Sequence, residues 1–164
     1  MSSGDHHHGS APSHLLDAAL ADPKVRQKLA RGIKIDKTHD VPYLGGISRD
    51  GRTVYIDRHL PPSLKIGGKS INPVPFLAVH ERTEHAIMTT LGLKYAAAHK
   101  LATAAEERRV NAAGIDPGEY EKALQPYIKA DAVEKLKKVP KDLFMGPYED
   151  EHDSGLIRRM KNVA

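Results

Sequence analysis

The stretch HERTEH, residues 80–85, lies inside a run of apolar residues and decides the fold that this sequence predicts. Apolar side chains flank or interrupt it at helical spacing: Phe76, Leu77, Val79, Ile87 and Leu91. A proline near the first turn and a glycine after the last apolar residue are typical of helix ends. We therefore predict a helix from about Pro75 to Leu91 that stops at Gly92.

Two ionisable residues of this helix fall on its apolar face. Each helical residue advances about 100°, so residues four apart share one side. His80 and Glu84 lie inside the apolar stripe, and Glu81 lies at its margin. His85 is predicted to point toward water, as a surface residue rather than a ligand.

The next segment repeats this arrangement. A second helix is predicted from about Lys94 to Ala113, because its apolar residues recur at helical spacing: Tyr95, Ala98, Ala102, Val110 and Ala113. His99 and Glu106, seven residues apart, share this inward side. Asp116-Pro117 then opens a third helix.

Four ionisable side chains are therefore predicted to face the interior from neighbouring helices: His80, Glu84, His99 and Glu106. Unpaired charges there would be costly. The chain has no cysteine, so any metal must take nitrogen and oxygen ligands. One hypothesis is a divalent ion, zinc by ligand type, held by His80, Glu84 and His99, with Glu106 as a candidate fourth ligand. The alternative is a metal-free network that pairs His80 with Glu106 and His99 with Glu84.

At this point the sequence resembles the zincin metallopeptidases, whose signature is a helix bearing His-Glu-x-x-His with a third ligand downstream. His80 matches the first ligand, Glu81 the general base, and His99 or Glu106 the third ligand. The departure is Glu84, which stands where the family has its second histidine. The resemblance implies a zinc ion with an open position for water and Glu81 as the catalytic base.

The resemblance covers roughly residues 45–113. The strand from Val54 to Asp57 is similar to the edge strand that lines the cleft of the zincin fold. Asp57 is a candidate acceptor that orients a liganding imidazole, a role that metal-bound histidines usually require. His59 is a candidate donor near the cleft, and Tyr95 is a candidate donor to an oxyanion.

Asp50-Gly51 is the strongest hairpin signal in the chain, because Asp-Gly readily adopts the positive φ angles of a tight turn. The arm that follows alternates apolar Val54 and Ile56 with polar residues, so one side of it is expected to be buried. Pro61-Pro62 ends this strand, and the stretch to Pro75 is expected to form a loop. The predicted fold is α+β and zincin-like: a small antiparallel sheet built around the hairpin and packed against three or more helices.

One globular domain is expected over residues 14–139, between a disordered tail at 1–13 and an irregular tail at 140–164. His6 to His8 lie in the first tail and are excluded from the site. The net charge of +4 is scattered along the chain, which argues against nucleic acid as a partner. No apolar stretch approaches the length of a membrane span or serves as a signal peptide, so a cytoplasmic location is expected.

Two classes of function follow from these patterns. In the first, the chain is a zinc hydrolase that acts on a peptide or amide bond of a peptide or protein substrate. In the second, it is a binding or assembly protein that uses the metal, or the polar network, only for stability. A fourth ligand from Glu106 would favour the second class, because it closes the position that a catalytic metal keeps open.

Overall fold

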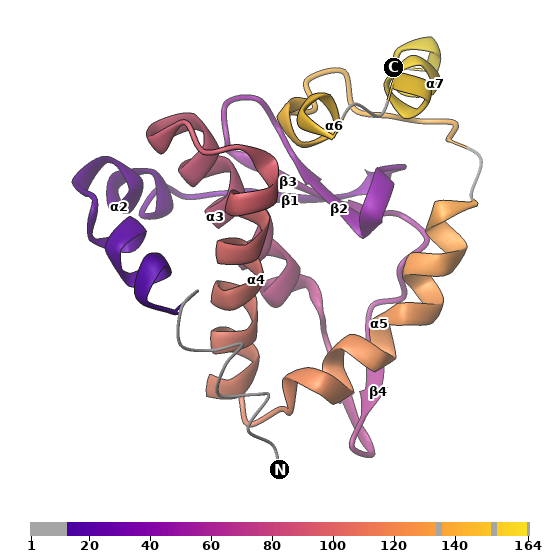
Figure 1. Cartoon of the computed structure of the whole chain (residues 1–164). Helices are drawn as coiled ribbons and strands as arrows, with labels where there is room; N and C mark the ends of the chain where they lie inside the picture. Colours follow the sequence, from indigo (N-terminus) through magenta and orange to yellow (C-terminus); the bar gives the residue numbers. More distant parts are fainter. Residues whose placement is uncertain (1–12, 134–135, 152–153, 164) are drawn as a thin grey trace.

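The computed structural model describes residues 13–133, 136–151 and 154–163, and it confirms the predicted α+β class (Figure 1). After a helical segment at 13–21, the helices are α2 (Pro23–Leu29), α3 (Val74–Leu91), α4 (Tyr95–Ala112), α5 (Pro117–Ala132), α6 (Gly146–Asp150) and α7 (Ser154–Val163). The strands are β1 (Lys34–His39), β2 (Gly45–Ile47), β3 (Thr53–Asp57), β4 (Leu64–Ile66) and β5 (Lys69–Ile71). A short turn, η1 (Pro42–Leu44), precedes β2.

The larger sheet has the strand order β1-β3-β2 and is mixed. Strands β2 and β3 run antiparallel, with Gly45 opposite Ile56, whereas β1 runs parallel to β3. The prediction of an antiparallel sheet therefore holds only for the β2–β3 hairpin. The expectation that Val54–Asp57 resembles an edge strand is wrong, because β1 occupies its outer side. Local hydrophobic patterns do not reveal such a pairing with an upstream strand.

Strand β3 is buried on both faces, not on one as its alternation predicts. Val54 and Ile56 pack into a core with Leu77 of α3. Tyr55 points the other way, into a second core that includes Leu143. The C-terminal part of the chain therefore covers the face of the sheet that was expected to meet water.

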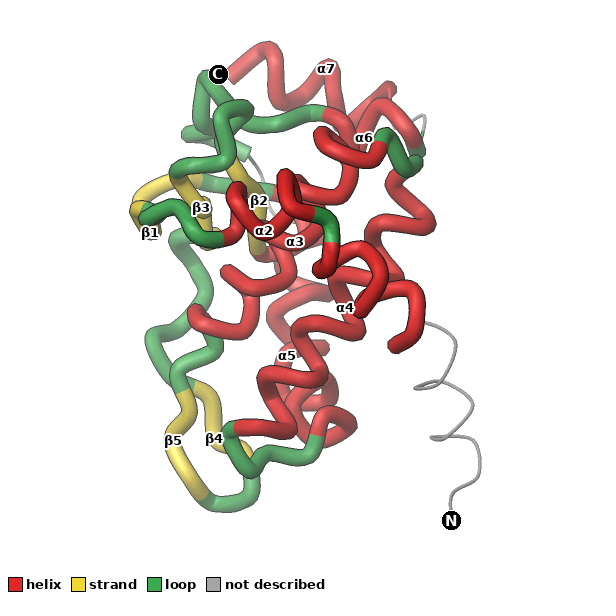
Figure 2. Tube along the Cα trace, turned by 90° about the vertical axis from the view of Figure 1, so that its left-hand side faces the viewer, coloured by secondary structure: helices red, strands yellow, loops and turns green. Residues whose placement is uncertain are grey.

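Both hairpin turns place glycine in the left-handed region of backbone conformation. Gly51, with φ of 74°, turns the β2–β3 hairpin and confirms the prediction from Asp50-Gly51. Gly67 and Gly68, with φ of 58° and 78°, turn β4 into β5. The stretch before Pro75 was expected to be a loop and instead contains this second hairpin. It lies at the end of the molecule opposite α6 and α7 in both views (Figures 1 and 2).

Helices α3 and α4 lie side by side near the centre of the molecule and carry the predicted site residues (Figure 1). Helix α3 ends at Gly92, whose φ of 69° is typical of a C-terminal cap. Helix α5 begins after Asp116, whose side chain accepts the backbone N–H of Glu119. Helices α3 and α4 start and stop within two residues of the predicted positions, and α5 starts where predicted.

The expected irregular tail at 140–164 is wrong, because α6 and α7 form there. Leu156 and Met160, four residues apart on α7, are buried with Tyr55 of the sheet. The segment before α6 is held by Asp40, whose carboxylate accepts the backbone N–H groups of Lys137 and Lys138, both at 2.8 Å. The expected N-terminal tail, apart from residue 13, which begins the first helical segment, lies outside the described residues.

Among the described residues, no helix combines the length and the apolar character needed to cross a membrane.

Candidate metal centre

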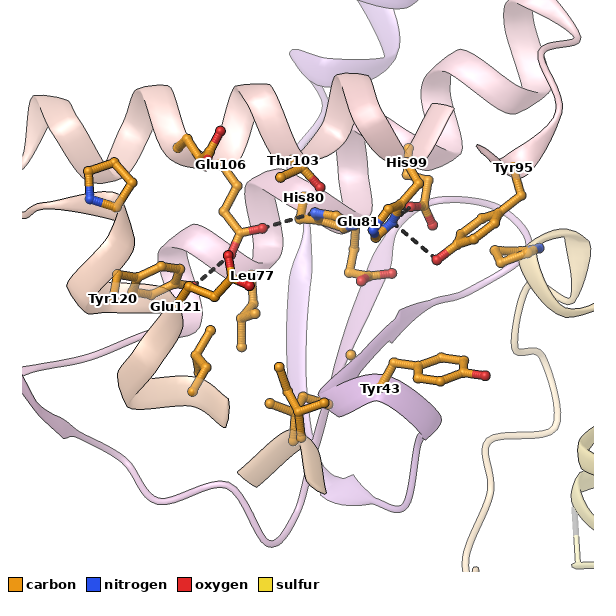
Figure 3. A pocket seen from close by; sticks show the side chains of 18 of the residues that line it. Tyr43, Leu77, His80, Glu81, Tyr95, His99, Thr103, Glu106, Tyr120 and Glu121 are labelled. Atoms are coloured by element: carbon orange, nitrogen blue, oxygen red, sulfur yellow. Dashed lines mark hydrogen bonds and ion pairs between the residues drawn. The ribbon is translucent and has the colours of Figure 1, made fainter. Parts of the chain in front are cut away.

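Three candidate ligand atoms converge between α3 and α4. His80 and Glu84 stand one turn apart on α3. His99 of α4 lies beside His80 (Figure 3). Oε2 of Glu84 lies 3.1 Å from Nε2 of His80 and 3.1 Å from Nδ1 of His99. One ligand atom from each of the three residues lies within 4.8 Å of the others. The helical periodicity therefore brings together the three residues that the sequence singled out.

Glu106 lies on the other side of the His80 ring from this cluster. Its Oε1 is 2.9 Å from Nδ1 of His80, and its Oε2 accepts the hydroxyl hydrogen of Tyr120 at 2.8 Å. A carboxylate that binds the second nitrogen of a metal-ligating histidine fixes the tautomer and orientation of that ring. Glu106 therefore contacts the second nitrogen of His80 and lies outside the group of three convergent ligand atoms.

Tyr95 borders the cluster from the first turn of α4. Its hydroxyl is 3.1 Å from Nδ1 of His99, the same nitrogen that faces Glu84. Its backbone N–H donates to Oδ2 of Asp150 at 2.8 Å, so α6 caps the start of α4. The Tyr95 hydroxyl is therefore held next to the ligand atoms.

The same contacts form a consistent network without a metal. Burial opposes protonation of His80, but hydrogen bonds to Glu106 and Glu84 outweigh it and hold the pKa of His80 well above its ordinary value. Burial would raise the pKa of Glu84, yet hydrogen bonds to His80 and His99 lower it. These are the two pairings that the metal-free alternative predicted, His80 with Glu106 and His99 with Glu84.

A divalent metal fits the same geometry. Two imidazole nitrogens and one carboxylate oxygen are a common donor set for zinc. With His80 deprotonated at Nε2, its Nδ1–H still donates to Glu106, so metal binding would leave that hydrogen bond intact. A metal at Nδ1 of His99 would take the place of the contact between that nitrogen and the Tyr95 hydroxyl.

Glu81 lies beside the cluster and packs against the sheet. A Cβ atom added to Gly45 of β2 would come within 3.3 Å of Oε2 of Glu81, so this close approach favours glycine. Burial, together with the negative charge of Glu84, raises the pKa of Glu81 to about 8. A cation next to it would lower that value.

A cavity of about 380 Å³ opens onto the cluster (Figure 3). The residues of the cluster and Glu81 line one part of it. Side chains of α5, among them Tyr120, Glu121 and Leu124, line another part. Tyr43 of η1 and Tyr148 of α6 complete the wall nearest the sheet. A volume of this size is typical of a small-molecule or peptide site.

Asp57 and His59 do not line this cavity. Asp57 accepts the backbone N–H groups of Val41 and His59, both at 3.1 Å. Nδ1 of His59 lies 3.4 Å from Asp57 and 3.6 Å from Asp40, so these three residues form a second His and Asp group. Arg58 already binds Asp40 there at 2.7 Å, which leaves little need for a metal.

His85 is buried, and its predicted surface position is wrong. Its Nε2 donates to the carbonyl oxygen of Arg49 at 2.9 Å, beneath the β2–β3 turn. It is not among the three residues whose ligand atoms converge.

Several cavity residues were not identified from the sequence as site residues, among them Glu121 and three tyrosines, Tyr43, Tyr120 and Tyr148. Tyr120 and Glu121 lie on the third predicted helix, but the sequence did not show that this helix faces the cluster. Tyr43 and Tyr148 come from a turn and a short helix without periodicity, so no local pattern indicates their position.

Compared with protein-family models, curated proteins and solved structures, the chain matches none. The resemblance of the α3 motif to zincins therefore stays a prediction.

Proposed function

We propose that this chain is a zinc-dependent hydrolase of peptide or amide bonds with a zincin-like arrangement of its site. The observation that carries the proposal is the convergence of His80 Nε2, Glu84 Oε2 and His99 Nδ1 at one wall of a cavity. Glu81 is a second carboxylate beside Glu84 in the same wall and is not needed to bind the ion.

Each residue has a distinct role in this proposal. A zinc ion acidifies a coordinated water and polarises a carbonyl group. His80, Glu84 and His99 hold the ion, and Glu106 orients His80. Glu81 accepts the proton of the attacking water and passes it to the leaving amine.

In this proposal the hydroxyl of Tyr95 stabilises negative charge on the carbonyl oxygen. It lies within hydrogen-bond distance of His99 Nδ1, so metal binding to that nitrogen leaves the hydroxyl hydrogen available for another acceptor. Burial raises the pKa of Tyr95, so the hydroxyl keeps its proton at neutral pH.

The test combines metal analysis with one substitution. The chain is prepared without chelator or immobilised nickel and without residues 6–8, and its zinc content is measured. Cleavage of a mixture of synthetic peptides is then followed by mass spectrometry. We expect about one zinc per chain, and we expect Glu81→Gln to abolish cleavage while the zinc content is unchanged. Cleavage that survives Glu81→Gln contradicts the role of Glu81.

A second candidate function is a binding or assembly protein with a structural metal. It is favoured by the bond between Tyr120 and Glu106, which links α5 to the pair α3 and α4 through His80. Under this candidate, zinc binds stoichiometrically but no peptide in the mixture is cut. If the chain binds no zinc, both candidate functions are wrong. The metal-free hydrogen-bond network then accounts for the cluster.

A further inference from the structure

The cavity differs from the rest of the chain in its charge. The chain carries 25 Lys and Arg and a net charge of +4, yet among the described residues no Lys or Arg lines the cavity. Five glutamates line it: Glu81, Glu84, Glu106, Glu107 and Glu121. A divalent ion at the ligand cluster offsets two negative charges and leaves the cavity acidic. Anionic substrates are disfavoured there, and cationic ones are attracted.

Aromatic rings accompany these carboxylates. Four of the six tyrosines of the chain line the cavity: Tyr43, Tyr95, Tyr120 and Tyr148. The rings of Tyr43 and Tyr148 are stacked, with centroids 6.2 Å apart and planes 23° apart. Ring faces attract ammonium and guanidinium groups, so tyrosine and glutamate together are a combination that suits organic cations.

Tyr148 lines the same cavity from α6. The residue is only 4% exposed, and burial raises the pKa of its hydroxyl well above the ordinary value, so the hydroxyl keeps its proton at neutral pH. A protonated hydroxyl at the cavity wall can donate a hydrogen bond to a polar atom of a ligand.

The backbone also holds Tyr43 in an unfavourable conformation. Tyr43 and Leu44 have φ of 58° and 69°, and the N–H of Leu44 donates to the buried carboxylate of Asp131 at 3.1 Å. Leu44 is 2% exposed, whereas Tyr43 is 58% exposed. The turn therefore buries Leu44 and holds the ring of Tyr43 at the cavity. Strained backbone of this kind is common at binding sites.

The two ends of the cavity are separated along α4. His99 and Glu106 are seven residues apart, or about 10 Å along the helix axis, which is roughly the length of three extended residues. Glu121 lies with Tyr120 on the α5 side, away from Tyr95 (Figure 3). A group bound at the ligand cluster can thus extend a long side chain toward Glu121.

We propose that the cavity selects a peptide or amide with a long cationic side chain, lysine or arginine, whose charged end lies against Glu121. The inference rests on the proposed function for the bond that is cut, but the binding preference does not depend on cleavage. Glu121 acts here as a specificity residue, and Glu119, an exposed residue two positions earlier on the same helix and outside the cavity wall, serves as its control.

The binding test uses two blocked amino acids whose ends carry no charge and which differ only in the side-chain amine. They are N-acetyl-lysine methylamide and N-acetyl-norleucine methylamide. Each is titrated into the full chain, with and without zinc, and binding is followed by NMR. Glu121 is exposed, so we expect the lysine probe to bind about two- to fivefold more tightly, the range for one exposed ion pair. Glu121→Gln should remove most of this ratio, and Glu119→Gln should preserve it.

The cleavage test uses matched peptides with lysine, norleucine or glutamate next to the bond that is cut. Lysine preferred over norleucine, with glutamate last, supports the inference. Equal binding of the two probes, or an equal effect of Glu119→Gln and Glu121→Gln, overturns it. If peptides are cut without a preference for lysine, the inference about lysine is wrong and the proposed hydrolase activity stands. If the lysine probe binds more tightly but no peptide is cut, the hydrolase proposal is wrong and the binding preference stands.

Discussion

Nδ1 of His80 lies 2.9 Å from Oε1 of Glu106, on the side of the imidazole opposite to the Nε2 atom that faces Glu84. The pair joins α3 to α4 through one hydrogen bond. It also determines which nitrogen of His80 is available to a metal, because Nδ1 keeps its proton for the carboxylate.

From this contact we predict that Glu106→Gln binds zinc more weakly. Loss of the charged acceptor makes Nε2 of His80 a weaker ligand and lets the ring turn, so zinc affinity should fall about 10- to 100-fold. Competition with a chromophoric chelator measures the change. Tyr120→Phe removes only the outer hydrogen bond to Glu106 and should have a smaller effect. An unchanged affinity in Glu106→Gln would show that the carboxylate does not orient His80.

Zinc removal predicts a change in thermal stability. A ligand that binds only the folded state at about 100 times its Kd stabilises it by about 2.7 kcal/mol, so chelation should lower Tm by several degrees. His99→Ala should abolish this difference, because one of three ligands is lost. His85→Gln is the control: it removes a buried hydrogen bond and should lower Tm, yet preserve the response to zinc. The same Tm with and without zinc would argue against a bound metal.

The carboxylate of Asp40, which holds the segment before α6, should make the stability of the chain depend on pH. Burial would raise its pKa, but the backbone N–H groups of Lys137 and Lys138 and the guanidinium of Arg58 hold it below the ordinary value of 3.8. A carboxyl whose pKa is lower when folded stabilises the fold above its unfolded pKa. This contribution is lost as pH falls through the depressed value.

We therefore expect Asp40→Asn to destabilise the chain by about 2 to 3 kcal/mol at pH 7 and by less near pH 3. Urea unfolding at both pH values measures the difference. A deficit that is equal at both pH values would show that the charge of Asp40 does not matter.

The helical pattern was enough to predict the three candidate ligands, but not the rest of the cavity. Helical periodicity is a local property, so it placed His80, Glu84 and His99 on facing sides of two consecutive helices before any contact was known. It did not show which side of His80 Glu106 occupies, since that depends on how α3 and α4 are rotated against each other. Nor did it place Asp57 and His59, which instead stabilise the chain around Val41 and Asp40.

The parts that could not be predicted depend on contacts between distant segments. Strand β1 pairs in parallel with β3, and the C-terminal helices cover the sheet through Leu143 and Met160. A periodic pattern within a segment, such as Leu156 and Met160 four residues apart, shows that one face is buried but does not show which distant segment covers it. The positive φ of Tyr43 is also invisible in sequence, since tyrosine seldom adopts it.

Because the backbone at Tyr43 is strained, we predict that Tyr43→Asn weakens peptide binding without lowering stability. Asparagine tolerates the left-handed conformation better than tyrosine, and the exposed ring contributes little burial, so stability should be unchanged or higher by up to about 1 kcal/mol. Peptide binding should weaken, because the ring that stacks on Tyr148 is lost. Thermal unfolding and probe titration test the two parts. A loss of more than about 1 kcal/mol would mean that the stack outweighs the strain.

We predict that alanine at Gly51, in the β2–β3 turn, lowers the free energy of unfolding more than alanine at Gly67, although both glycines have a positive φ. A Cβ atom at Gly51 would lie 2.7 Å from the ring of His85, which is buried and bound to Arg49 and therefore cannot move aside cheaply. Gly67 also has a positive φ, but nothing lies within 4 Å of its Cβ position. Gly51→Ala should thus cost about 3 kcal/mol, from strain and overpacking together, and Gly67→Ala about 1 kcal/mol from strain alone. Urea unfolding of both variants measures the difference, and equal costs would mean that His85 does not pack beneath this turn. Because His85 follows Glu84 directly on α3, a larger cost at Gly51 would show that the hairpin fixes the helix that carries the candidate ligands.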